Sequence, residues 1–396
     1  MSPLRISNIT VTTALGDGLD ANWAALRDDR SALAPCTFEQ MPVEAWGGEV
    51  PGLDMPLPAR FSAFDCRNNR LAERALAADG FEQDVARVIA RYGAHRVGLF
   101  TGTSTSGILE SERAYRRLDP RTGALPNGFA YAETHNTYAL GRFLRARLAL
   151  KGPGFTLSTA CAATAKLFAV ARRMIDAGFC DAAVIGGADS FCGTTLFGFH
   201  ALGVMAEGPC RPFDAARSGI SIGEAAGFAL LERLVDVPDP DPLLLLGAGE
   251  SSDAHHMSSP EPGAAGAVIA MRAALADAEL EPDDIDHVNL HGTATLTGDA
   301  AEDKGVTKVF GPAVARSSVK GFTGHTLGAA GIVSAAVAAL AIRHGFLPGS
   351  PHTRTVDPAF AAGHVLIGRP ARVQKVMCNA FGFGGVNCSF IIGTLP

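Results

Sequence analysis

Three residues of this chain, Cys161, His291 and His325, have side chains and local settings suited to acyl transfer. Cys161 stands where the apolar strand of residues 154–158 turns into a helix. A thiol at a helix N-terminus faces unpaired N–H groups and the positive end of the helix dipole, which lower the thiol pKa and can hold an oxyanion. His291 directly follows an apolar strand, and His325 precedes an apolar helix. A thiolate nucleophile with imidazole partners is the arrangement that covalent acyl transfer uses.

Each of these residues also has a purely structural interpretation. A cysteine in an apolar setting usually packs as a small hydrophobic residue, and a lone histidine at a strand end is usually a packing residue. The joint occurrence of a helix-start cysteine and two histidines at strand or helix ends favours a catalytic centre. Such centres form at the carboxyl ends of parallel strands.

A glycine-dense loop near the C-terminus, Asn-Ala-Phe-Gly-Phe-Gly-Gly at residues 379–385, carries Phe381 and Phe383. It lacks the helix start and the lysine of a phosphate-binding loop. An ordinary turn between strands is one interpretation. We favour a mobile gate with glycine hinges.

The elements that must position these residues are repeated along the chain. A strand at residues 97–100 ends in Gly102-Thr103-Ser104-Thr105, and a strand at residues 288–290 ends in the similar turn Gly-Thr-Ala-Thr at 292–295. Each half then has an apolar helix, one after Cys161 and one at residues 327–342, with glycine stops at Gly178 and Gly345. A helix that is apolar all round is buried, so we expect two central helices between parallel sheets.

A Pro/Asp-rich run at residues 237–242 separates the two halves. It predicts an N-terminal unit over residues 1–240 and a C-terminal unit over residues 241–396. Residues 108–150 have no counterpart in the second half. We expect them to form a cap or a subunit contact.

Composition excludes several classes of protein. With 396 residues, 47% hydrophobic, the chain is long enough for a large layered core, and its net charge of −6 argues against nucleic-acid binding. None of the 8 cysteines forms a C-x-x-C pair, so no metal site is expected. The N-terminus does not read as a signal peptide, and the longest apolar stretch is too short to span a membrane comfortably, so we expect a cytoplasmic protein. Glycine, at 45 residues, is in excess of the usual share.

Three separated motifs resemble those of β-ketoacyl-acyl-carrier-protein synthases of the elongating branch. They are Ser-Thr-Ala-Cys at residues 158–161, His-Gly-Thr-x-Thr-x-x-x-Asp at 291–299 and Lys-x-x-Thr-Gly-His-x-x-Gly-Ala-Ala-Gly at 320–331. The resemblance runs nearly end to end, and two active-site histidines separate it from the initiating branch that uses coenzyme A primers. It implies the thiolase fold, an α/β architecture of two duplicated halves in a five-layered αβαβα sandwich.

The resemblance implies a role for each residue of the centre. Cys161 would carry the acyl primer, with its own N–H and that of Phe383 as the oxyanion hole. His291 and His325 would bind the malonyl thioester and assist loss of CO2. The enolate would then attack the acyl thioester in a Claisen condensation that extends the chain by two carbons.

Further residues take supporting roles by the same resemblance. Lys320 and Glu302 would form a buried pair that sets the electrostatics of the centre. The substrate-binding residues would be Thr293 and Thr295 on the pantetheine arm, together with Phe381, Phe383 and Thr105. Arg67 and Arg70 would dock the acidic carrier protein.

No cofactor is expected beyond the phosphopantetheine of the acyl-carrier protein. That carrier is the expected partner, together with a second subunit in a homodimer or in a heterodimer with a related synthase or chain-length-factor-like subunit. Residues 102–107, 249–254 and 68–70 are similar to those of aryl-polyene synthases, which leaves a polyene or polyketide pathway open beside fatty-acid synthesis. Two alternatives remain: a non-catalytic chain-length-factor-like partner, which the retained Cys161 disfavours, and a coenzyme A thiolase, for which no second catalytic cysteine is apparent.

Overall fold

The main sheet consists of two halves whose strands follow the same order. The computed structural model describes residues 2–40, 43–234 and 242–395. Reading outward from the centre, the first half places its strands in the order β1 (Leu4–Thr13), β9 (Ala225–Arg233), β7 (Ala182–Asp189), β5 (Val97–Gly102) and β6 (Gly154–Leu157). The second half places β10 (Leu244–Ser252), β16 (Val386–Gly393), β15 (Lys375–Gly382), β11 (His287–Asn289) and β12 (Ala315–Ser317) in the corresponding order.

Strand directions repeat as well. In each half the three outer strands are parallel, as predicted, and the two inner strands are antiparallel to their neighbours. The prediction of wholly parallel sheets is therefore wrong for the inner strands. The clearest reason is the connection between β15 and β16, which is a tight turn, and a tight turn can join only antiparallel strands.

The two half-sheets touch at one corner and then separate. The join between β1 and β10 consists of the pairs Leu4 with Leu245 and Arg5 with Leu244. Beyond it, α6 (Ala163–Asp176) and α11 (Ala330–His344) lie between the two halves of the sheet and contact strands of both. The layers are therefore helix, sheet, helix, sheet, helix, and the predicted five-layered thiolase fold is confirmed.

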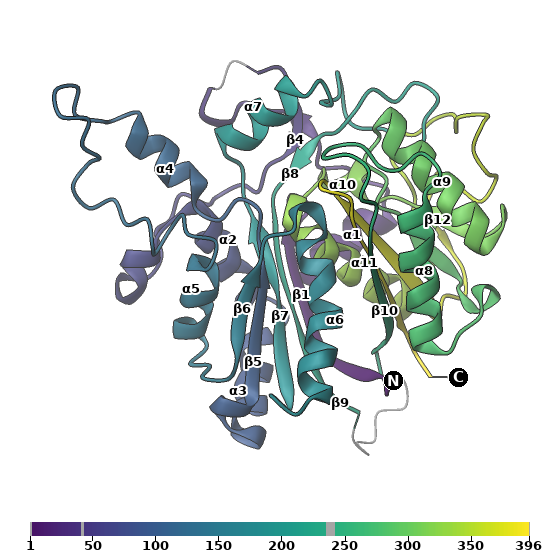
Figure 1. Cartoon of the computed structure of the whole chain (residues 1–396), viewed down its shortest axis with the longest axis horizontal. Coiled ribbons are helices and arrows are strands. Elements are labelled where there is room, and N and C mark those ends of the chain that lie inside the picture. Colours follow the sequence, from purple (N-terminus) through teal and green to yellow (C-terminus); the bar gives the residue numbers. More distant parts are fainter. Residues whose placement is uncertain (1, 41–42, 235–241, 396) are drawn as a thin grey trace.

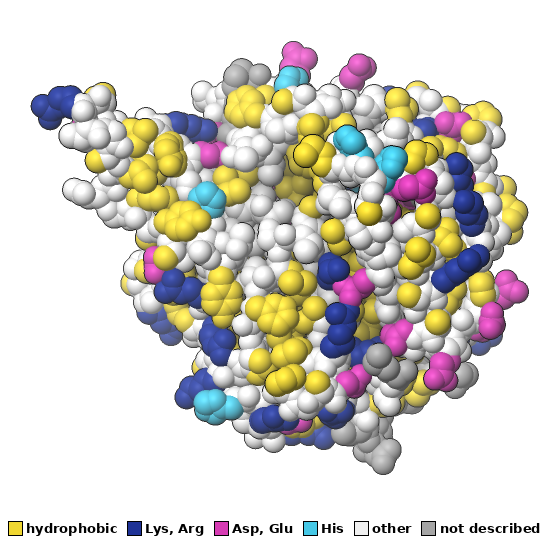
Figure 2. Space-filling model, viewed as in Figure 1, with side chains coloured by type: hydrophobic (Ala, Val, Ile, Leu, Met, Phe, Trp, Pro, Cys, Tyr) yellow, Lys and Arg dark blue, Asp and Glu magenta, His cyan; other side chains and the backbone are white. Residues whose placement is uncertain are grey.

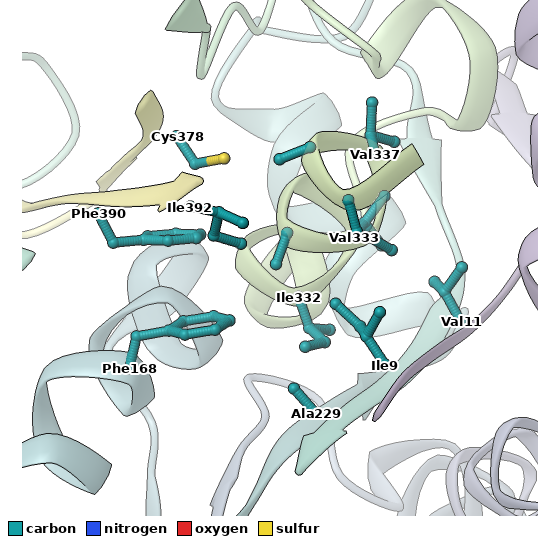
Figure 3. Packing of buried hydrophobic residues seen from close by; sticks show 14 of the residues in the cluster. Ile9, Val11, Phe168, Ala229, Ile332, Val333, Val337, Cys378, Phe390 and Ile392 are labelled. Carbon is teal, nitrogen blue, oxygen red and sulfur yellow. The ribbon is translucent and has the colours of Figure 1, made fainter. Parts of the chain in front are cut away.

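The middle layer is as apolar as the sequence indicated (Figure 3). Ile332 and Val333 of α11 pack toward Ile9 of β1, while Phe168 of α6 stacks on Phe390 of β16 with ring centroids 4.3 Å apart. Among the described residues, Leu327–His344 is the segment that is long and apolar enough to cross a membrane, and 83% of it is buried inside the protein. Its composition is that of a core helix between two sheets.

Helices cover the two outer faces. The first half is covered by α2 (Arg67–Leu76), α3 (Phe81–Tyr92) and α5 (Ala139–Arg147), and the second half by α8 (Ala265–Ala278) and α9 (Leu296–Phe310). The segment 108–150 is a projecting cap only in part. Its first helix, α4 (Ile108–Tyr115), and the loop after it extend away from the sheet (Figure 1), but Leu140, Phe143 and Leu144 of α5 are fully buried in the outer layer.

The remaining elements are short or peripheral: α1 (Gly18–Arg27), α7 (Gly193–Ala201), α10 (Lys320–Thr323), β2 (Gly16–Asp17), the small sheet β3 (Ala34–Pro35), β4 (Trp46–Gly48) and β8 (Ile222–Gly223), and the pair β13 (Phe346–Leu347) and β14 (Arg369–Pro370). The predicted boundary between residues 240 and 241 lies outside the described residues. The described chain leaves the first half-sheet at Arg233 and enters the second at Leu244.

Candidate active site

Cys161 lies in the short turn that opens α6, and the residue before it has an unusual backbone conformation. Ala160, directly before it, has a φ of 47°, a left-handed value that costs a residue with a Cβ atom. The side chain of Cys161 is almost fully buried, 6% exposed. Strain at such a turn is characteristic of functional positions, because the surrounding structure must enforce it.

The two predicted histidines lie at the same place. His325 Nε2 is 3.0 Å from Cys161 Sγ. The rings of His291 and His325 are 5.3 Å apart between centroids and meet edge to face at 87°. Residues from positions 161, 291 and 325 of the sequence therefore form one cluster, at the point where the N-terminal ends of α6 and α11 approach each other.

The electrostatics of the cluster differ from the sequence-based expectation. Burial raises the pKa of Cys161 to about 12, and the positive charge of Lys320 only partly opposes this. The expected low thiol pKa is therefore wrong, because desolvation of the thiolate outweighs the favourable helix start. Burial, with Lys320 acting in the same direction, holds the pKa of both His291 and His325 well below its usual range. Both rings are thus neutral near pH 7, and each has one N–H to donate.

Lys320 and Glu302 act on one peptide. The Glu302 carboxylate accepts hydrogen bonds from the backbone N–H groups of His291 and Gly292, both at 2.7 Å, and from Asn379 Nδ2 at 3.2 Å. Lys320 Nζ donates to the carbonyl oxygen of His291. The two charges thus hold His291 from either side of its backbone, and no direct ion pair between them is found among the described residues.

Two backbone N–H groups point at the nucleophile. The N–H of Phe383 and that of Cys161 itself interact with the sulfur and lower its pKa slightly. Phe383 lies in the turn between β15 and β16, where Gly384 and Gly385 have φ values of 86° and 76°. Its ring stacks on Phe199 of α7, with centroids 5.6 Å apart. The oxyanion-hole role that the resemblance implies for these N–H groups stays a prediction.

A cavity of about 210 Å³ leads to these residues. Cys161, His291 and His325 line it, together with Phe381 and the predicted pantetheine contacts Thr293 and Thr295, whose hydroxyl oxygens are 3.0 Å apart. Its remaining walls include apolar residues from α7 and the turn after it, and polar residues from the segment that follows β10: Phe199, Leu202, Val204, Asp253, His256 and Ser258. His256, which lines the cavity, is exposed. Figure 2 shows histidine and hydrophobic side chains close together on the upper right of the molecule.

Thr105, expected near the substrate, is not among the residues that line the cavity. It is 1% exposed, and its hydroxyl donates to Asp189 Oδ1 at 2.9 Å. The expectation of a substrate-binding role is therefore wrong. The hydroxyl is already used inside the core by a carboxylate that lies far away in the sequence.

The two predicted docking arginines are engaged within the chain. Arg67 is 8% exposed, and its guanidinium forms two hydrogen bonds with the fully buried Glu224, at 2.6 and 2.7 Å. It is not available to a carrier protein, and that prediction is wrong. Arg70 forms a bidentate pair with Asp65 at 2.7 and 2.8 Å, so a docking role for its partly exposed side chain stays a prediction.

Sequence reasoning missed several residues that support the centre. Asp189, at the end of β7, binds the turn after β5, and Asn379 joins Glu302 to β15. Asp299 was visible only as the last residue of a motif. Its carboxylate accepts from the N–H groups of Phe213 and Ala294 at 2.6 and 3.0 Å. The available signal for Asp189 was a lone polar residue at the end of an apolar strand. Asn379 lies inside β15, among apolar residues.

Comparison with known proteins addresses the family. The model described as "Beta-ketoacyl synthase, N-terminal domain" matches residues 1–237, and "Beta-ketoacyl synthase, C-terminal domain" matches residues 244–354. The chain belongs to the β-ketoacyl synthase family. It is an acyltransferase, and its reaction is the decarboxylative Claisen condensation that extends an acyl chain by two carbons. The two alternatives, a non-catalytic partner subunit and a coenzyme A thiolase, are not favoured.

Individual relatives agree with this assignment. This β-ketoacyl synthase is 30% identical to "3-oxoacyl-[acyl-carrier-protein] synthase 2" of Vibrio cholerae, over 98% of this chain and 97% of the relative. It is 32% identical to "Nodulation protein E" of Rhizobium leguminosarum bv. trifolii, over 96% of both. Among solved structures, a chain of "Ketosynthase (ApeO) in Complex with its Chain Length Factor (ApeC) from Xenorhabdus doucetiae" superposes with a TM-score of 0.90 at 36% identity, covering 100% of this chain and 98% of that one.

Proposed function

We propose that Cys161 is the nucleophile that takes the acyl primer from a carrier-protein thioester. Sγ attacks the thioester carbonyl, and the thiol proton passes by way of His325 Nε2 to the departing carrier thiol. The observation that carries this proposal is the 3.0 Å separation of Sγ and Nε2 at the end of the cavity. A thiol whose pKa is raised by burial needs such a base at contact distance, because little thiolate exists without one.

His291 and His325 then act on the second substrate. As neutral rings they donate N–H groups to the thioester carbonyl of malonyl-carrier protein, whose oxygen becomes negative when CO2 leaves. Nδ1 of each ring has no hydrogen-bond partner among the described residues, so neither ring is locked in one tautomer. The enolate carbon attacks the acyl carbonyl on Cys161, the oxyanion is held by the N–H groups of Cys161 and Phe383, and collapse releases the Cys161 thiolate and the 3-oxoacyl product.

Thr293 and Thr295 line the entrance and have hydroxyl groups that fit the amides of a phosphopantetheine arm. The Vibrio cholerae relative is also named for an acyl-carrier protein. We therefore infer that carrier-bound phosphopantetheine supplies both substrates.

All eight cysteines are unpaired, in keeping with a reaction that takes place in the cytoplasm.

A second subunit is part of the proposal. The strand β6 is the outer edge of the first half-sheet, and its Phe155 is 37% exposed. Figure 2 shows a group of hydrophobic side chains over the part of the molecule where Figure 1 draws β6 and α6. An open edge of this kind is available for pairing with another chain. The partner is a second copy or a related chain-length-factor subunit, as in the Xenorhabdus doucetiae complex. A monomeric mass at micromolar concentration, with and without the candidate partner, would contradict this.

Intact-protein mass spectrometry tests the chemistry. Acyl-carrier protein should add an acyl group to the wild type but not to Cys161→Ala, and malonyl-carrier protein should then give a product two carbons longer. Wild type that forms no adduct with any primer would overturn the proposal. A panel of saturated, polyunsaturated and aryl primers assigns the pathway; preference for the last two would support the polyene hypothesis, and preference for saturated primers would reject it.

A further inference from the structure

Asp189 binds both halves of the molecule although it belongs to none of the three motifs at residues 158–161, 291–299 and 320–331. It is the last residue of β7 and is fully buried. Its carboxylate accepts hydrogen bonds from the hydroxyls of Thr103 and Thr105 and from the N–H groups of Ser104 and Thr105, at 2.6 to 3.1 Å. Among the residues that the structure describes, it forms no ion pair. All of its hydrogen bonds therefore come from uncharged donors.

The hydroxyl of Ser104 also donates to Asp189 Oδ2. One further hydrogen bond of Asp189 crosses to the second half. The N–H of Gly328, three residues after His325, donates to Asp189 Oδ2 at 2.5 Å. The carbonyl oxygen of the same residue accepts from the hydroxyl of Thr164 at 2.6 Å, and Thr164 stands three residues after Cys161. Both polar groups of Gly328 are therefore held by the half of the molecule that carries the nucleophile.

This contact depends on very close backbone approach. A Cβ atom on Gly328 would lie 2.8 Å from Asp189 Oδ2, and one on Gly331 would lie 2.2 Å from the nitrogen of Ala165. The N-terminal ends of α6 and α11 can meet only because these positions lack side chains. The hydroxyl of Thr164 also accepts from the N–H of Ile332 at 3.1 Å, so it spans the first turn of α11.

The arrangement repeats what is seen at the other histidine. The backbone of His291 is held on its N–H side by Glu302 and on its carbonyl side by Lys320. Near His325, Asp189 takes the N–H side and Thr164 takes the carbonyl side of Gly328. We propose that Asp189 and Thr164 are positioning residues that hold His325 at contact distance from Cys161 by fixing the backbone at Gly328.

This inference rests on the proposed roles of Cys161 and His325. A displacement of about 1 Å between reacting groups can cost on the order of 100-fold in rate. Asp189→Asn, which loses one acceptor and the charge, should therefore lower kcat for condensation about 10- to 100-fold. Thr164→Val should lower it about 10-fold, and Thr164→Ser, which keeps the hydroxyl, should restore most of the rate.

Alkylation of Cys161 by iodoacetamide across pH separates positioning from simple destabilisation. The charge of Asp189 is one of the causes that raise the pKa of Cys161, so Asp189→Asn should move the alkylation midpoint to lower pH while condensation becomes slower. Thr164→Val removes no charge and should leave that midpoint in place. The matched control is Asp214→Asn: Asp214 is also buried, accepts from the N–H groups of Ala216, Arg354 and Thr355, and does not line the cavity. It should lose stability with kcat unchanged.

The outcomes are distinct. Folded Asp189→Asn with wild-type kcat and midpoint, or Thr164→Ser as slow as Thr164→Val, would overturn the inference. If Asp189→Asn does not fold, the Thr164 pair decides alone. Wild type that fails to condense, or Cys161→Ala that still does, would instead refute the proposed function.

Discussion

The two Gly-Thr-x-Thr turns of this protein have similar sequences and equivalent places in the two half-sheets, yet only one of them reaches the cavity. At residues 102–105 the hydroxyls of Thr103 and Thr105 turn to a buried carboxylate, that of Asp189. At residues 292–295 the hydroxyls of Thr293 and Thr295 line the cavity.

The difference follows from the origin of the carboxylate. Glu302 and Asp299, on the helix after the second turn, bind only backbone N–H groups of that turn. The hydroxyls of Thr293 and Thr295 therefore bond to each other beside the cavity and not to a carboxylate. Asp189 comes from the neighbouring strand and binds hydroxyls as well as N–H groups. A duplicated turn thus becomes a structural link in one half and a binding surface in the other.

The starts of the two central helices form a similar pair. The residue before Cys161 is Ala160, with a φ of 47°, and the residue before His325 is Gly324, with a φ of 75°. Both helices therefore present their catalytic residue from a left-handed turn. Only the second has the residue type that adopts this conformation without cost.

The largest expected effect is the loss of activity when His291 is replaced, compared with replacement of a buried histidine that lies away from the cavity. His291→Ala removes one of two donors to the enolate and should lower kcat for condensation about 100- to 1000-fold. The control is His287→Asn, since His287 is also buried but contacts Ser317 and does not line the cavity. Steady-state rates and urea unfolding of both variants give the result. Equal rate losses in the two would contradict the role assigned to His291.

The free energy of unfolding is expected to depend on pH through Asp299, whose carboxyl group binds the turn at residues 292–295. Burial raises the pKa of Asp299 to about 7, whereas an unfolded aspartate ionises near pH 3.9. Between about pH 4 and pH 7 the folded chain keeps a proton that the unfolded chain has released, so this group's contribution to stability falls as pH rises. Relative to Asp299→Asn, the wild type should lose up to about 1.4 kcal/mol of unfolding free energy per pH unit in that window. Urea unfolding of both proteins at pH 5, 6 and 7 measures this. The same change of unfolding free energy with pH in the wild type and in Asp299→Asn would contradict the prediction.

The two turns can be compared directly by one substitution in each. Thr295→Val should raise KM for the carrier-bound substrate about 5- to 10-fold with little change in kcat, because one hydrogen bond of about 1 kcal/mol is lost. Thr105→Val should leave KM unchanged and lower the free energy of unfolding by about 1–3 kcal/mol, because Asp189 loses a buried donor. A raised KM in Thr105→Val would restore the rejected substrate-binding role.

The smallest expected effect concerns the helix starts. Ala160→Gly should stabilise the protein by up to about 1 kcal/mol, since glycine adopts a positive φ without the steric cost that alanine has. Gly324→Ala should destabilise it, because the new Cβ atom would lie 2.7 Å from the carbonyl oxygen of Ile222. Thermal unfolding of both variants measures the signs. Destabilisation by Ala160→Gly would mean that the turn before Cys161 is not strained.

Local sequence was sufficient to predict the central helices, the duplication and the three residues that meet at the cavity, because each of these has a signature within a few positions. The failures were non-local. The direction of the Thr105 hydroxyl depends on Asp189, and the burial of Arg67 depends on Glu224, each far away along the chain. The raised pKa of Cys161 likewise comes from layers contributed by both halves, which no single motif encodes.

The central position of β1 in the sheet has a consequence for how the chain folds. The N-terminal strand β1 lies in the middle of the sheet order, and its main partner is β9, with Leu4 opposite Arg233. During synthesis most of β1 therefore has no partner strand except the short β2 until the residues of β9, up to Arg233, have left the ribosome. Long-range pairing of this kind is slow and exposes an apolar strand to aggregation. We therefore expect a chain truncated before β9 to require chaperones and not to fold as an independent half.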